Sequence, residues 1–222
     1  MLHLPRVLDA EQLVLLRAIA ARAPWIDGRV TAGGGAVERK RNEQVDETST
    51  DGEILSDTVM KALHRYPLFA AAAYPARVSR ALMNRYGPGM EYGPHVDNPL
   101  MGGTHPLRTD LSATLFLSDP SDYDGGELVV ESLAGRQAIK LPAGDLFLYP
   151  ATRVHHVAPV TRGTRVAAVF WVQSLVADAE ERSLLFEMSQ VLAMLEQKHG
   201  PSAEITRLAA CHARLVHRWA QP

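Results

Sequence analysis

A run of short apolar segments, separated by tight turns, occupies the middle of this 222-residue chain. The segments cover residues 77–86, 111–117, 128–130, 138–141, 146–149, 154–160 and 165–172. Turns rich in glycine, proline and aspartate, such as residues 87–89 and 124–127, separate them, and no helical repeat intervenes. Seven or eight short strands joined in this way predict an antiparallel jelly roll, or double-stranded β-helix, rather than a parallel α/β sheet.

Helical patterns precede the strands. Asp9 and Gln12 have the spacing of a capping box, and apolar residues then recur at helical intervals, which predicts a helix over residues 10–23. A second amphipathic pattern begins at residue 51 and ends near Tyr66, just before a proline. We expect this second helix to pack against the outside of a sheet.

A different pattern begins at Asp178, where the strands give way to two apolar helical stripes separated by Gly200 and Pro201. This predicts a C-terminal α-helical hairpin whose apolar face covers either the jelly roll or a partner subunit. The second alternative would make the protein a homo-oligomer. The chain is thus expected to be mainly β with flanking helices. Residues 1–176 would form the jelly-roll domain with its N-terminal helices, and residues 177–222 a helical extension.

Composition limits the classes of partner. The formal net charge of −2 gives no broad basic surface for nucleic acid or an anionic membrane, and the hairpin's basic residues form no recognition face. Cys211 is the only cysteine, which is typical of a reducing compartment. The N-terminus lacks a signal-peptide pattern, and no apolar run is long enough to span a bilayer. These features predict a cytoplasmic protein without a membrane or nucleic-acid partner.

Candidate metal ligands lie between and within the predicted strands. His95 and Asp97 are two residues apart, so they share one face of an extended strand, and a second histidine pair, His155 and His156, lies downstream. Only one of these neighbouring histidines can point inward. Two histidines and one carboxylate form the facial triad that holds ferrous iron in oxygenases, with Arg165 following on the last strand. A His-x-Asp pair alone is a weak signal, and the glycine-rich, β-patterned context strengthens it.

A polar segment at residues 36–50 has Arg39, Arg41, Asn42 and Gln44 in near alternation. It is either a strand that lines a polar pocket or a loop. We regard these four residues as candidates for substrate contact.

In combination, several motifs resemble those of the Fe(II)/2-oxoglutarate-dependent dioxygenases, specifically the bacterial PKHD-type hydroxylases related to prolyl and lysyl hydroxylases. The stretches that carry the resemblance are residues 84–86, 90–98, 108–114, 123–128, 149–150 and 155–165, and the similarity continues through the C-terminal helices. It therefore covers nearly the whole chain.

The resemblance implies that His95, Asp97 and His155 bind Fe(II) and that Arg165 binds the distal carboxylate of 2-oxoglutarate. A guanidinium suits that role because it offers a permanently charged, bidentate fork. By similarity with prolyl hydroxylases, Tyr86 is a hydrogen-bond donor to 2-oxoglutarate, although a core tyrosine at a strand end fits the sequence equally well.

The implied reaction uses dioxygen, converts 2-oxoglutarate to succinate and carbon dioxide, and hydroxylates an aliphatic carbon, with L-ascorbate keeping the iron ferrous. The substrate is either peptidyl proline or lysine, or a small molecule. Some relatives are associated with iron uptake. Two alternatives come from other classes: a non-catalytic sensor that binds metal or 2-oxoglutarate, and a zinc hydrolase, which also uses two histidines and a carboxylate.

Overall fold

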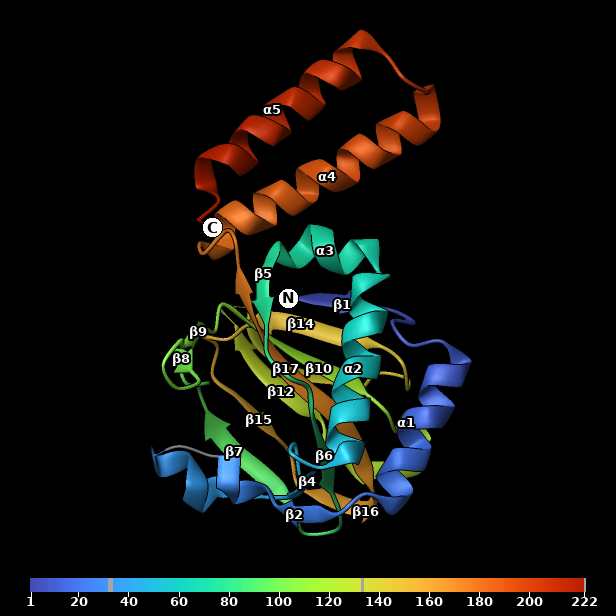
Figure 1. Cartoon of the computed structure of the whole chain (residues 1–222), viewed down its shortest axis with the longest axis vertical. Helices are drawn as coiled ribbons and strands as arrows, with labels where there is room; N and C mark the ends of the chain where they lie inside the picture. The colour runs from blue at the N-terminus through green and yellow to red at the C-terminus, as the bar shows by residue number, and fades with distance from the viewer. Residues whose placement is uncertain (32–33, 133, 222) are drawn as a thin grey trace.

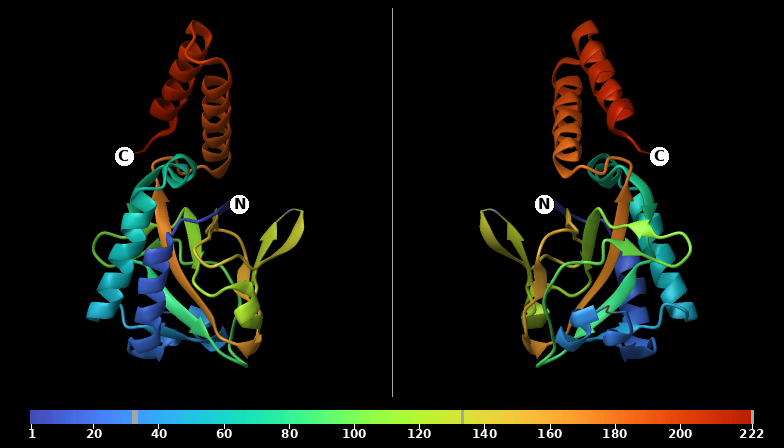
Figure 2. Two further views of the ribbon diagram at one scale, coloured as in Figure 1. Left: turned by 90° about the vertical axis from the view of Figure 1, so that its right-hand side faces the viewer. Right: turned by 90° about the vertical axis from the view of Figure 1, so that its left-hand side faces the viewer.

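The computed structural model describes residues 1–31, 34–132 and 134–221, with the backbone alone for residues 34–36. Its centre is a pair of antiparallel sheets that face each other, with helices on one outer face (Figures 1 and 2). The prediction of a jelly roll is confirmed.

The larger sheet has eight strands, all antiparallel to their neighbours. Its order is β1 (Leu2–Leu4), β14 (Leu146–Pro150), β10 (Leu111–Phe116), β17 (Arg165–Ser174), β6 (Leu82–Tyr86), β4 (Glu43–Val45) and β2 (Trp25–Asp27), and β5 (Pro75–Val78) also pairs with β17. The smaller sheet has the order β13 (Gly135–Ile139), β12 (Leu128–Ser132), β15 (His155–Val157), β7 (Glu91–His95) and β3 (Lys40–Arg41).

Two short ribbons complete the β structure: β8 (Leu100–Met101) with β9 (Leu107–Arg108), and β11 (Tyr123–Gly125) with β16 (Val160–Gly163). The second ribbon requires glycine at residue 125, in the glycine-rich turn that the sequence indicated. At Gly125 φ is +71°, and an added Cβ would lie 2.1 Å from the carbonyl oxygen of Pro159. A larger residue would therefore both strain the backbone and clash with the neighbouring strand.

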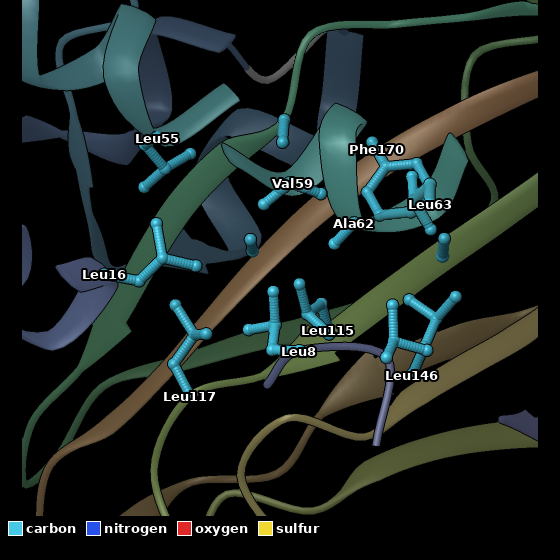
Figure 3. Close-up of a cluster of buried hydrophobic side chains, with 14 of the residues drawn as sticks. Leu8, Leu16, Leu55, Val59, Ala62, Leu63, Leu115, Leu117, Leu146 and Phe170 are labelled. Atoms are coloured by element: carbon cyan, nitrogen blue, oxygen red, sulfur yellow. The ribbon is translucent and has the colours of Figure 1, made fainter. Parts of the chain in front are cut away.

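The main hydrophobic core lies between the larger sheet and helices α1 (Ala10–Arg22), α2 (Thr50–His64) and α3 (Pro67–Ala73). Leu16, Leu55 and Val59 of the helices meet Leu115 and Phe170 of the sheet there (Figure 3). A second cluster fills the space between the sheets and includes Phe116 and Phe147. Because both faces of the larger sheet are packed, its strands form a rigid wall for whatever lies between the sheets.

Several local expectations differ from the structure. Residues 77–86 form two strands, because Ser79 and Arg80 interrupt the ladder and Ser79 bonds to the backbone of Trp171 instead. The polar segment at residues 36–50 contains the end of a 3₁₀ helix, η2 (Gly34–Arg39), and the short strands β3 and β4. Helix α3 and strand β1 were not predicted.

The chain ends in the hairpin of α4 (Ala179–His199) and α5 (Ala203–Trp219), which projects from one end of the β structure (Figure 1). Asp178 caps α4 through the backbone N–H groups of Glu180 and Glu181, as its position in the sequence indicated. No helix in the described part of the chain is both long and apolar enough to cross a membrane.

Candidate metal centre

Three side chains at one end of the smaller sheet, two from its strands and one from the loop that follows β7, form a cluster of metal-ligating atoms. Strand β7 ends at His95, Asp97 follows just beyond it, and β15 begins with His155, which pairs with His95 across the sheet. One potential ligand atom from each residue lies within 4.8 Å of the other two, and His155 Nε2 is 3.7 Å from Asp97 Oδ2. Two imidazoles on neighbouring strands and one carboxylate just beyond them fit a divalent metal bound on one side.

Hydrogen bonds orient these side chains. The Nδ1 atoms of His95 and His155 lie 2.8 Å from Gly93 O and 3.0 Å from Arg153 O. Each ring must donate from Nδ1 to such a carbonyl, which leaves the lone pair of Nε2 free for a metal. Burial and the neighbouring His155 lower the pKa of His95 to about 4, so its ring is neutral at pH 7.

The carboxylate has its own support from the larger sheet. Ser112, a buried residue of β10, donates its hydroxyl to Asp97 Oδ2. A charge-assisted bond of this kind restricts the carboxylate rotamer and stabilises its ionised form. The cluster is therefore held from both sheets.

His156 lies outside this cluster. It pairs with Val129 of β12, and its Nδ1 atom is buried without a hydrogen-bond partner among the described residues. Neighbouring residues of a strand point to opposite faces, and here His155 is the one that lies beside His95 and Asp97.

Arg165 begins strand β17, directly opposite Tyr86 of β6. Arg165 is only 1% exposed, and its guanidinium carbon lies 5.3 and 5.5 Å from the ring centroids of Tyr86 and Phe116. Its Nε has no hydrogen-bond partner among the described residues. A buried cation without a carboxylate partner is costly, so the site favours a bound anion. Burial raises the pKa of Tyr86 to about 12, which keeps its hydroxyl a neutral donor.

One cavity of about 930 Å³ joins the metal cluster to Arg165. Its lining includes His95, Asp97, His155, Arg165, Tyr86, Ser112, Thr114, Tyr149 and Lys40. Its volume is at the upper end for small-molecule sites, so it has room for more than one small molecule.

Some of these residues were not found by sequence reasoning. Tyr149 is buried edge-on against His155, with ring centroids 5.1 Å apart, and burial raises its pKa well above the ordinary value. Ser112 and Lys40 were also missed. Ser112 and Tyr149 lie in stretches that carry the family resemblance, whereas Lys40 lies in the polar segment, where alternation gives no signal.

The polar candidates at residues 39–44 bond elsewhere. Arg39 donates to Pro94 O, Arg41 pairs with Glu91, and Asn42 donates to Asn84. Gln44 accepts from the Thr31 hydroxyl. None of the four is among the described residues that line the cavity, whereas the lysine between the two arginines is.

Comparisons with known proteins agree with this arrangement. Residues 81–173 match the family described as the 2OG-Fe(II) oxygenase superfamily. A PKHD-type hydroxylase of Janthinobacterium sp. (strain Marseille) is 47% identical over 223 residues, which cover 99% of each chain. PKHD-type hydroxylase YbiX of Escherichia coli O7:K1 (strain IAI39 / ExPEC) is 45% identical over 225 residues, covering 100% of this chain and 99% of that protein.

A solved structure is similar in fold. The viral collagen prolyl hydroxylase vCPH from Paramecium Bursaria Chlorella virus-1 superposes with a TM-score of 0.54 at 17% identity, covering 78% of this chain and 95% of that one. At this level of identity the likeness concerns the jelly roll alone.

Proposed function

The chain belongs to the PKHD-type hydroxylases of the 2OG-Fe(II) oxygenase superfamily, and from this premise we propose how its own residues serve a 2-oxoglutarate-dependent dioxygenase. His95, Asp97 and His155 hold Fe(II), and Arg165 with Tyr86 holds 2-oxoglutarate. The observation that carries the proposal is the three-residue cluster sharing a cavity with a buried, unpaired arginine.

When bound, Fe(II) with 2-oxoglutarate and dioxygen supplies the oxidising chemistry that turns an aliphatic C–H bond into an alcohol, releasing succinate and carbon dioxide. The protein supplies geometry and electrostatics. His95 and His155 present Nε2 because each Nδ1 is engaged by a backbone carbonyl, and Ser112 holds the Asp97 carboxylate.

Arg165 sets the orientation of the co-substrate. Its guanidinium pairs with the carboxylate of 2-oxoglutarate that lies away from the metal, and the Tyr86 hydroxyl donates a hydrogen bond to the same group. The aromatic rings of Tyr86 and Phe116 exclude water from this end of the cavity, which strengthens the ion pair.

The first test is anaerobic titration of Fe(II)-loaded protein with 2-oxoglutarate, followed through the weak visible metal-to-ligand charge-transfer band. We expect the band in the wild type and its loss in Asp97→Ala. Absence of the band from iron-loaded wild type would refute the proposal.

Two further measurements separate the rival classes. Formation of succinate from 2-oxoglutarate distinguishes an enzyme from a sensor that only binds. A zinc hydrolase has no use for a buried arginine, so dependence of turnover on Arg165 argues against it. We also expect ascorbate to prolong turnover by keeping the iron ferrous.

A further inference from the structure

A second buried cation, Lys40, lies in the cavity and has no role in the proposed metal or 2-oxoglutarate sites. It belongs to β3, the edge strand of the smaller sheet, and is 7% exposed. Its Nζ is 5.4 Å from the ring centroid of Tyr92, and Tyr92 in turn stacks on His95 with centroids 3.7 Å apart. The ammonium group thus lies beside the aromatic ring that stacks on a metal ligand.

The hydrogen-bonding capacity of Lys40 is largely unused. An ammonium group has three donors, and Nζ donates one to Thr31 Oγ1 at 2.9 Å. Lys40 takes part in none of the ion pairs within the described residues. Residues 32–36, 133 and 222, whose side chains are not among those described, include no aspartate or glutamate that could pair with Lys40. Asp27 and Asp97 act on the Lys40 ammonium group through space, without an ion pair in contact, and buried lysines are rarely left without a paired carboxylate.

The net charge of the cavity also favours a bound anion. Besides the metal cluster and Arg165, its charged lining residues are Lys40, Glu47 and Arg80, and the last two are exposed and opposite in sign. With Fe(II), Asp97, Arg165 and Lys40 in place, the buried site carries three net positive charges. Binding of 2-oxoglutarate, which has two negative charges, leaves one positive charge, and an anionic substrate would neutralise it.

Part of the outer wall of the cavity is apolar, beside the exposed Glu47 and Arg80. Val30, Val96 and Leu100 line this part and are exposed on the side that faces solvent, and Trp171 lines the cavity from β17. Exposed apolar side chains gathered around a cavity mouth indicate an apolar occupant.

We propose that Lys40 binds a carboxylate of the substrate, and that the substrate therefore combines this carboxylate with an apolar body. The inference rests on the proposed function, because it assumes that 2-oxoglutarate occupies Arg165. Burial lowers the pKa of Lys40 to about 8, which still leaves the amine mostly protonated at pH 7, and a bound anion would favour the charged form further.

The chain has four lysines, which makes the side chain observable by NMR. The full chain, labelled with ¹³C at lysine Cε, is loaded with diamagnetic Zn(II) and saturating 2-oxoglutarate. It is then titrated with N-acetyl-leucine or with its neutral amide as probes. The Lys40 signal is assigned with Lys40→Met, and Lys61→Met, an exposed lysine of α2, is the matched control.

We expect the Lys40 signal to shift with the carboxylate probe, which should bind about tenfold more tightly than its amide because a charge-assisted bond is gained. Lys40→Met should bind the two probes with equal affinity, whereas Lys61→Met should keep the preference. A merely structural role would weaken both probes alike, so loss of the preference is the decisive readout.

Three results would overturn the inference: no shift of the Lys40 signal with either probe, equal affinity for both probes in wild type, or loss of 2-oxoglutarate binding in Lys40→Met. The last would place Lys40 in the co-substrate site. A wild type that fails to bind 2-oxoglutarate at all would instead overturn the proposed function, so the two failures are distinguishable.

Discussion

Replacing Arg165 with methionine should weaken 2-oxoglutarate binding without destabilising the empty protein. Arg165 is 1% exposed, and its Nε has no partner among the described residues, so an apolar side chain of similar length removes an unpaired buried charge. The lost hydrogen bonds to a carboxylate contribute about 1.5–3 kcal/mol each. With two such bonds, affinity should fall at least about a hundredfold.

Thermal unfolding of Zn(II)-loaded protein measures both effects. A concentration of 2-oxoglutarate about 100 times its Kd stabilises the wild type by about 2.7 kcal/mol. For a chain of this size, that should raise Tm by about 5–10 °C. At the same concentration Arg165→Met should show little or no rise, while its Tm without 2-oxoglutarate should equal or exceed that of wild type.

Arg162→Met is the matched control, because Arg162 is an exposed arginine of β16 that pairs with Asp124 on β11, the other strand of its ribbon. It should keep the full rise with 2-oxoglutarate. If Arg165→Met unfolds at a lower temperature in the absence of 2-oxoglutarate and yet retains the rise, Arg165 serves the fold and not the co-substrate.

Three other predictions concern the metal cluster. Asp97→Ala should abolish stoichiometric Fe(II) binding in anaerobic titration, whereas His156→Ala should retain it; equal loss in both would contradict the choice of ligands. Ser112→Ala should raise the Kd for Fe(II) about 10–100-fold, since it frees the carboxylate that Ser112 holds, and an unchanged Kd would remove Ser112 from the site. In metal-free protein, lowering the pH from about 6.5 to 4 should reduce stability by at most about 3 kcal/mol through His95. Its folded-state pKa of about 4 lies below the unfolded value, so the unfolded chain binds the proton first. Urea unfolding at pH 4 and 6.5 measures this loss, and His95→Gln should flatten the slope.

The architecture followed from the sequence because strand alternation and turn residues are local signals. The elements that were not predicted are too short to give such a local signal. Strand β3 has only two residues and β1 three, which is too short to establish alternation. Helix α3 is seven residues long and lies immediately after α2, so the proline at its start was interpreted only as the end of the preceding helix.

Lys40 was missed for a related reason. In a polar segment, alternation does not reveal which side chains point inward, because arginine, lysine and asparagine give no contrast in hydropathy. The arginines on both sides bond to residues of β7, Arg39 to Pro94 O and Arg41 to the Glu91 carboxylate, whereas Lys40 between them lines the cavity. That placement depends on the pairing of β3 with β7, which only the folded structure reveals.

The choice between His155 and His156 depends on strand register in the same way. His155 and His95 are sixty residues apart in the chain but directly opposite each other across the sheet, and the register shifts between His155 and Val157. Opposite residues on one face approach closely enough to share a ligand, whereas a slip of one residue would turn His156 inward. An imidazole would face the cavity in either register. The two registers differ in the bond from Nδ1 to Arg153 O, which in this structure orients His155. The sequence therefore predicts a histidine ligand from this strand, and the backbone around Arg153 favours His155.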